Sequence, residues 1–142
     1  IVWEKPAPVT LAPGARGGTV RTYLRDAWRF SDGEWTRLAD LPTPLAAAAS
    51  PAPVFGEHVY VVSGDDGTQA GLASPARHTG FSRRILRYDT VRNVWHHAAD
   101  LAMPPPVTLP TAPWADGFAL LNGEVRPGVR SAQVLLFRLA SR

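Results

Sequence analysis

The sequence contains no cysteine, which excludes a disulfide framework, a zinc ribbon and a thiol nucleophile. No apolar run approaches the roughly 20 residues that a membrane-spanning helix needs. Helical periodicity over a useful length is missing as well. The chain is therefore predicted to be neither a disulfide-stabilised mini-protein nor an all-α domain, and no membrane partner is expected.

Prolines and glycines separate the short apolar runs. The 142 residues include 14 prolines and 12 glycines, spread along the chain rather than gathered in one tract. This distribution is typical of many short strands joined by turns. Hydrophobic residues make up 45% of the chain, which excludes a disordered protein. We therefore predict an all-β fold, forming one domain or part of a larger one.

The net charge is small, at +3, and the arginines are scattered singly among acidic residues apart from Arg83-Arg84. Nucleic-acid binding requires a basic stripe, ideally interleaved with aromatic residues. The pattern instead predicts a mixed solvated surface and no nucleic-acid partner.

Short apolar segments bounded by turn residues define the expected strands. The segment 46–54 is rich in alanine, which favours helix by propensity, but Pro51 and Pro53 prevent a helix from continuing there, so we predict an innermost strand. A long loop is expected over 65–82. The predicted strands are 27–30, 34–38, 46–54, 58–64, 85–88, 94–97, 107–114, 118–121 and 133–137.

These strands repeat. Phe30, Trp35 and the Asp-Leu-Pro of residues 40–42 align with Tyr88, Trp95 and the Asp-Leu of residues 100–101. Four strands in roughly 50 residues is typical of propeller blades. The predicted organisation is an irregular start (1–20), the outer hairpin of a first blade (21–45), a complete blade (46–103) and an incomplete last blade (104–142). We interpret four tryptophans as blade-packing aromatics: Trp28, Trp35, Trp95 and Trp114.

A charged turn near the C-terminus is the most informative local feature. In the Pro-Gly pair of residues 127–128, proline presets the second position of a turn and glycine tolerates the positive φ of the third. A rigid turn there sets Glu124 and Arg126 on one face of an extended segment, against Arg130 just past the bend. The pattern predicts an anion site with a general base beside it. The alternative is a surface ion pair between Glu124 and one of the two arginines.

The blade motif resembles the kelch repeat of β-propellers. Within that superfamily, residues 63–69 (Ser-Gly-Asp-Asp-Gly-Thr-Gln), residues 78–89 and residues 122–130 (Asn-Gly-Glu-Val-Arg-Pro-Gly-Val-Arg) together look like the N-acetylneuraminate epimerases, or sialic acid mutarotases, including their cyclically permuted relatives. The resemblance covers about residues 20–139, and the Gly-Glu-x-Arg-Pro-Gly-x-Arg stretch is its most specific part. It implies about two to three four-stranded antiparallel blades of a six-bladed kelch propeller.

The resemblance also implies an activity. Sialic acid mutarotases interconvert the α and β anomers of N-acetylneuraminate, and Glu124 matches their proton acceptor. Arg130, with Arg126 as second choice, is expected to bind the sugar carboxylate. No metal or organic cofactor is implied, because no electrons move. The resemblance further implies a soluble protein of the bacterial periplasm or cytoplasm.

Five further residues are substrate-binding candidates. Three of them follow the predicted strand 58–64, just as Glu124 follows the predicted strand 118–121: Asp65, Asp66 and Gln69. We therefore expect them on the same face of the propeller as Glu124, where they could bind sugar hydroxyls. The alternative is a strand-terminating Asp-Asp-Gly turn. His78 and Arg84 lie in or beside the long loop, where the alternative for each is an ordinary polar loop residue.

Two other readings of the chain remain open. The kelch pattern alone fits a non-catalytic protein-interaction module equally well. Six-bladed mutarotases look more than twice as long as this chain, and its first residue is Ile1 rather than Met. The chain is thus expected to be a fragment, a degenerate copy, or a protomer that self-associates to complete its ring, since unpaired blade edges favour association.

Overall fold

The computed structural model describes residues 22–138 except residue 73, so the irregular start predicted for residues 1–20 lies outside the described part. Across the described residues the chain is built of short antiparallel strands, with one 3₁₀ turn, η1 (Pro75–Arg77), and no helix long and apolar enough to cross a membrane. The all-β prediction is confirmed. The strands are β1 (Trp28–Ser31), β2 (Glu34–Arg37), β3 (Val54–Phe55), β4 (His58–Val62), β5 (Arg84–Asp89), β6 (Val94–Asp100), β7 (Thr111–Trp114), β8 (Gly117–Leu121), β9 (Glu124–Arg126), β10 (Val129–Arg130) and β11 (Val134–Arg138).

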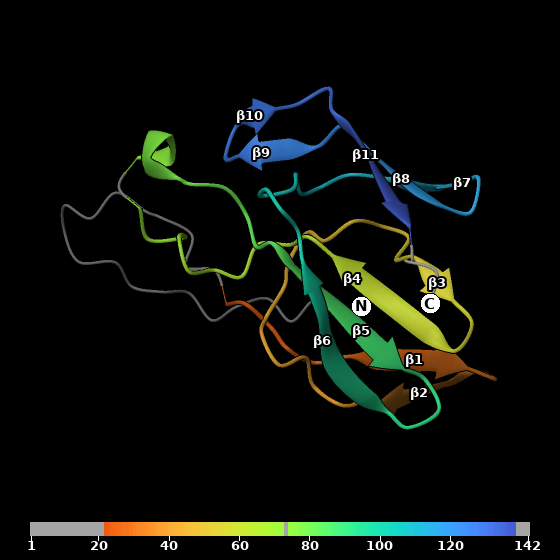
Figure 1. Ribbon diagram of the computed structural model, residues 1–142. Helices are drawn as coiled ribbons and strands as arrows, with labels where there is room; N and C mark the ends of the chain where they lie inside the picture. Colours follow the sequence, from red (N-terminus) through yellow and green to blue (C-terminus); the bar gives the residue numbers. More distant parts are fainter. Residues whose placement is uncertain (1–21, 73, 139–142) are drawn as a thin grey trace, which may run out of the picture.

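The strands pair into blade-like sheets (Figure 1). A four-stranded sheet, β3-β4-β5-β6, lies between the β1–β2 hairpin and a three-stranded sheet ordered β7-β8-β11. The small β9–β10 hairpin branches off between β8 and β11. Except around 46–54 and 107–111, the strands lie where the sequence predicts them, within three residues at each end.

The segment 46–54 is not the continuous inner strand that the sequence predicts. Ala46 exchanges two backbone hydrogen bonds with Asp65, just beyond β4, so the segment does run along the inner edge of the sheet. Regular pairing is interrupted because Ala47 has a positive φ of 55° and Pro51 has no N–H to donate. The prediction had the position right and the continuity wrong.

The predicted strand 107–114 is shortened for the same reason. Thr108 has φ 53°, repeating the left-handed conformation of Ala47, and β7 begins only at Thr111. The Thr108 N–H donates to the carbonyl of Ala47 at 2.9 Å. The two irregular inner segments therefore lie side by side and join successive sheets.

Matching aromatic pairs confirm the repeat. Phe30 lies directly opposite Trp35 in the β1–β2 hairpin, with ring centroids 5.0 Å apart, and Tyr88 lies opposite Trp95 across β5 and β6 at 4.8 Å. The Trp95 indole N–H donates to the carbonyl of Ala39 at 2.8 Å and so ties the first hairpin to the four-stranded sheet. The blade-packing interpretation fits Trp95. The other three tryptophans of that prediction remain largely exposed in the described part of the chain, and it stays a prediction for them: Trp28, Trp35 and Trp114.

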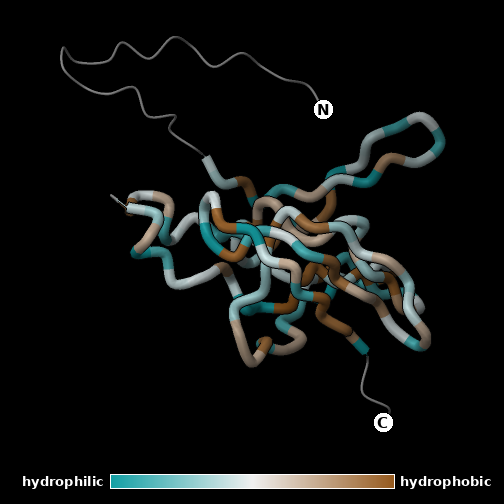
Figure 2. The backbone as a smooth tube through the Cα atoms, turned by 90° about the horizontal axis from the view of Figure 1, so that it is seen from above, coloured by the Kyte–Doolittle hydropathy of each residue, from teal (hydrophilic) through white to brown (hydrophobic). Residues whose placement is uncertain are grey.

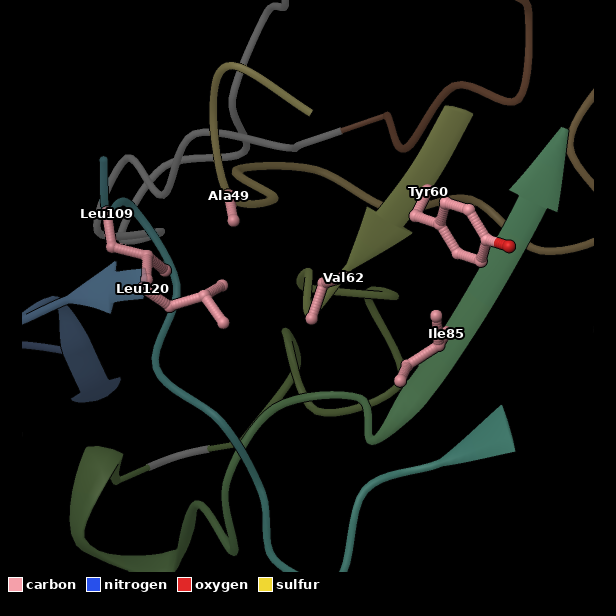
Figure 3. Close-up of a cluster of buried hydrophobic side chains, with 6 residues drawn as sticks. All are labelled: Ala49, Tyr60, Val62, Ile85, Leu109 and Leu120. Atoms are coloured by element: carbon pink, nitrogen blue, oxygen red, sulfur yellow. The ribbon is translucent and has the colours of Figure 1, made fainter. Parts of the chain in front are cut away.

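The core lies between the four-stranded sheet and the β7-β8-β11 sheet. Figure 3 shows Val62 and Ile85 of the first sheet facing Leu120 of the second, with Tyr60 beside them in the same cluster. Hydrophobic stretches gather at the centre of the molecule (Figure 2), and each large buried side chain contributes about 1.5–3 kcal/mol to stability. The buried cluster consists of Ala49, Tyr60, Val62, Ile85, Leu109 and Leu120.

A capped turn fixes the β5–β6 hairpin. One carboxylate oxygen of Asp89 accepts the backbone N–H groups of Val91 and Arg92, at 3.0 and 2.8 Å. The N–H of Arg92 is the main reason that the pKa of Asp89 lies below its ordinary value, aided by the Arg92 guanidinium. The Tyr88 hydroxyl donates to the Asn93 side chain at 2.7 Å, and burial raises the pKa of Tyr88. Both residues of the Tyr-Asp motif thus serve the turn.

Candidate functional site

The charged stretch forms the β9–β10 hairpin, with the turn at the predicted Pro-Gly pair. Gly128 has φ 77°, as the third position of such a turn requires. The strand register places Glu124 opposite Arg130 and Arg126 opposite Val129, with a bulge between the last two residues of the hairpin. The hairpin thus holds one carboxylate and two guanidiniums within a few residues of one another.

The Glu124 carboxylate is half-buried, and it is positioned by its own hairpin. Its Oε1 accepts the backbone N–H of Gly128 at 2.8 Å. Within the described part of the chain, Glu124 forms no ion pair, so the surface pair with Arg126 or Arg130 is not observed. Both guanidiniums are exposed, and among the described residues neither has an ion-pair partner. Among the described residues, one oxygen of the Glu124 carboxylate and both guanidiniums therefore have no partner, and such groups are suited to acid–base chemistry on an anionic ligand.

Two loops extend from the same side of the sheets. Val107 exchanges two backbone hydrogen bonds with Glu124, at 2.8 and 2.9 Å, just as Ala46 does with Asp65. Asp65 and Glu124 thus begin equivalent loops after β4 and β8. Figure 1 shows the 65–82 loop and the β9–β10 hairpin both pointing away from the β3–β4 and β7–β8 turns.

Asp65 and Asp66 form the first turns of the long loop. Asp65 accepts the Tyr23 hydroxyl at 2.8 Å and the Gly67 N–H at 3.0 Å. Asp66 accepts both the N–H and the hydroxyl of Thr68, at 3.0 and 2.6 Å. This is the geometry expected of the Asp-Asp-Gly turn, with Asp66 the more exposed to a ligand because it also lines a cleft.

Gln69 and His78 hold the two ends of the loop together. The Gln69 amide donates to the carbonyl of Gly80 at 2.7 Å and accepts the N–H of Thr79 at 2.8 Å. His78 is buried, accepts the Gly80 N–H on Nδ1 at 3.1 Å, and packs against the Phe81 ring at a centroid distance of 4.7 Å. Both side chains shape the loop through bonds to its own backbone.

A cleft of about 510 Å³ opens between this loop and the ends of β5 and β6. It brings together three of the predicted substrate-binding residues, Asp66, Gln69 and Arg84. Arg84 also donates to the Thr43 hydroxyl at 2.8 Å. Asp65, His78 and the residues of the β9–β10 hairpin do not line it. The full lining is Asp66, Thr68, Gln69, Thr79, Gly80, Phe81, Ser82, Arg83, Arg84, Asp100 and Pro104.

Sequence reasoning missed several polar groups of this cleft. Arg83 and Asp100 add a second guanidinium and a second carboxylate, and three hydroxyl side chains lie beside them. Asp100 could have been noticed in the sequence, because it ends a blade motif. Its position beside the loop, however, depends on the pairing of Arg84 with Asp100 across β5 and β6. The missed hydroxyls are those of Thr68, Thr79 and Ser82.

Comparisons with known proteins identify similar kelch proteins. No model of a known protein family matches the chain. It is 26% identical over 98 residues to Kelch repeat and BTB domain-containing protein 2 of Ectromelia virus (strain Moscow), covering 63% of this chain and 17% of that protein. It is also 26% identical over 127 residues to the protein of the same name from Cowpox virus (strain Brighton Red), covering 84% of this chain and 19% of that one. The chain thus spans less than a fifth of the length of these relatives.

A solved structure shows the same fold. The chain superposes on YjhT with a TM-score of 0.60 and 18% sequence identity, over 82% of this chain and 44% of YjhT. At this identity the likeness concerns the fold alone. With the kelch-repeat relatives and the antiparallel sheets, it shows that the described part consists of kelch-type β-propeller blades.

Proposed function

We propose that this kelch-propeller chain is a carbohydrate isomerase of the N-acetylneuraminate epimerase type, which interconverts the α and β anomers of sialic acid. The observation that carries the proposal is the β9–β10 hairpin. Glu124 and Arg130 lie opposite each other, and neither has an ion-pair partner among the described residues. The resemblance of residues 122–130 to the mutarotase motif and the likeness of fold to YjhT support it.

In the proposed mechanism Glu124 is the general base. Its carboxylate takes the proton of the anomeric hydroxyl, the bond between the anomeric carbon and the ring oxygen breaks, and the ring oxygen takes a proton from solvent water, which gives the open-chain ketone. The reverse transfers close the ring on the other face. Sialic acid carries a carboxylate on the anomeric carbon, which the planar guanidinium of Arg130 can bind through two hydrogen bonds, with Arg126 beside it. A positioned base of this kind contributes about 10²–10⁴-fold to the rate.

The neighbouring loop supplies the remaining contacts in this proposal. Asp66 and Arg84 line the cleft and bind ring or glycerol-chain hydroxyls of the sugar. Asp65, Gln69 and His78 take part by holding the loop in shape, through the bonds they make to Tyr23 and to the loop backbone.

The test is anomer exchange of N-acetylneuraminate measured by NMR, with binding measured by calorimetry. We expect the protein to accelerate exchange, Glu124→Gln to slow the catalysed rate at least 100-fold while still binding the sugar, and Arg130→Ala to lose binding. Glu57→Gln, in the exposed turn after β3, is the matched control and should retain both properties. Full exchange activity in Glu124→Gln would remove the base assignment.

A second candidate is a non-catalytic kelch interaction module, whose loops on one face bind a protein. It is favoured by the similarity to the viral Kelch repeat and BTB domain-containing proteins. The same calorimetric experiment separates the two functions. Sugar binding that disappears in Arg130→Ala supports the isomerase, whereas no sugar binding by the intact protein supports the module.

A further inference from the structure

Two apolar surfaces remain exposed at opposite ends of the sheet stack. The Phe30 face, on the β1–β2 hairpin, comprises Phe30 and Trp35, which are 58% and 60% exposed. The Trp114 face, on the β7-β8-β11 sheet, comprises Trp114, Val134 and Leu136, which are 62%, 55% and 56% exposed. Exposed aromatic and aliphatic clusters of this kind mark interaction surfaces.

The faces lie at opposite ends because the four-stranded sheet separates their parent elements. Tyr88 and Trp95, on one side of this sheet, line a groove together with Trp28 of the first hairpin and with Ala27 and Leu38, which flank it. Ile85 points to the other side, because it lies three residues from Tyr88 on the same strand, and there it joins the core with Leu120.

The contact between the four-stranded sheet and the β7-β8-β11 sheet shows how such a face is covered within the chain. Phe55 projects from the four-stranded sheet onto the following sheet, with ring centroids 5.2 Å from Phe118 and 6.2 Å from Phe137. Phe55 lies opposite His58, the first residue of β4, and Trp114 lies opposite Gly117, the first residue of β8. Trp114 is thus the equivalent of Phe55 one sheet later, with no following described sheet to pack on.

Phe30 is the equivalent of Phe137, one of the two residues on which Phe55 packs. Phe137 pairs with the second residue of β8, as Tyr88 pairs with the second residue of β4. Tyr88 in turn lies opposite Trp95 as Phe30 lies opposite Trp35. Phe30, Tyr88 and Phe137 therefore occupy one repeated position, which faces the preceding sheet.

Inside the chain, Phe55 of one sheet packs on Phe137 of the next. Trp114 corresponds to Phe55 and Phe30 corresponds to Phe137, so the Trp114 face and the Phe30 face are complementary in the same way. We propose that two copies of this chain associate head to tail, the Trp114 face of each packing on the Phe30 face of the other. One chain covers 44% of YjhT, so two copies supply close to the length of that propeller. A contact between unlike surfaces closes into a ring when the rotation allows it, leaving neither face exposed.

This proposal does not depend on the sialic acid activity. Cross-linking tests it directly, since the chain has no native cysteine. Trp114→Cys and Phe30→Cys are prepared separately, mixed, unfolded and refolded together, and oxidised. A disulfide-linked dimer is expected from the mixture and not from either variant alone. Mixing Trp114→Cys with Val91→Cys, an exposed position in the β5–β6 turn, is the control and should give no dimer. Cross-linking of Trp114→Cys with itself would indicate a like-to-like contact and overturn the proposal.

Light scattering of the unmodified chain gives the second readout. A mass of twice 15.3 kDa at micromolar concentration is expected. Leu136→Asp and Phe30→Asp, both at exposed positions, should each give folded monomers, and mixing the two should restore a dimer, because one Trp114 face and one Phe30 face remain intact. A monomeric unmodified chain overturns the proposal and leaves further blades of a longer polypeptide as the cover of both faces.

Discussion

Asp65 and Glu124 occupy the same position in two successive blades, but their side chains have different partners. Each residue exchanges two backbone hydrogen bonds with the inner segment of its own blade. The Asp65 carboxylate then accepts the Tyr23 hydroxyl, 42 residues away, whereas the Glu124 carboxylate, among the described residues, bonds only to Gly128 of its own hairpin. One copy of the repeat therefore uses its acid to connect distant parts of the chain, and the other uses its acid to hold its own turn.

The two acids should differ in their effect on stability. Asp65→Ala removes the acceptor for the Tyr23 hydroxyl and the Gly67 N–H in a partly buried setting, which should lower the free energy of unfolding by about 1–3 kcal/mol. Glu124→Ala removes a single exposed bond and should cost less than about 1 kcal/mol. Urea denaturation measures both. Equal losses would show that Glu124 is structural as well.

Gly123 and Gly128 provide a matched pair on the same hairpin, both with positive φ, 101° and 77°. A Cβ on Gly128 meets nothing within 4 Å, so Gly128→Ala should cost only the backbone strain, about 1–2 kcal/mol. A Cβ on Gly123 would lie 2.7 Å from the Pro106 side chain and 2.8 Å from the Val107 carbonyl. Gly123→Ala should therefore lower the melting temperature clearly more. Equal shifts would contradict this close packing.

Ser63 should be an important link between the four-stranded sheet and the inner segment of the next one. Its fully buried hydroxyl donates to the Pro106 carbonyl at 2.5 Å. Ser63→Ala leaves this carbonyl without its donor and should cost about 1–3 kcal/mol in urea unfolding. Ser31→Ala, at the exposed end of β1, is the control and should change stability by less than about 0.5 kcal/mol.

Asp89 should make the protein sensitive to acid. Its pKa is lowered in the folded state, chiefly by the Arg92 N–H, so its stabilising effect is complete above the ordinary value of 3.8 and is lost as the pH falls through the lower folded pKa. Asp89→Asn should be less stable than the unmodified chain at neutral pH, with the difference shrinking as the pH falls below about 3.8. Denaturation at a series of pH values checks this. A difference independent of pH would show that the carboxylate charge plays no part.

Local signals predicted the hairpins well, because their determinants lie within a few residues. Pro127 and Gly128 were sufficient for the β9–β10 turn, and the aligned Tyr88 and Trp95 identified the repeat. The inner segment 46–54 was mispredicted as a continuous strand, since its path depends on contacts with Asp65 and with the following blade rather than on its own residues. The proline positions signalled a break but not its geometry.

The sequence by itself determined the all-β architecture, the repeat and the charged hairpin, because turn chemistry and alternating apolar residues act over short distances. Only the tertiary structure decided which side chains of the candidate site are already engaged. Gln69 and His78 bind the backbone of their own loop, while Asp100 joins the cleft through the pairing of β5 with β6. Hydrogen bonding and exposure depend on residues brought together from distant parts of the chain. The same dependence separates the packed Trp95 from the exposed Trp114.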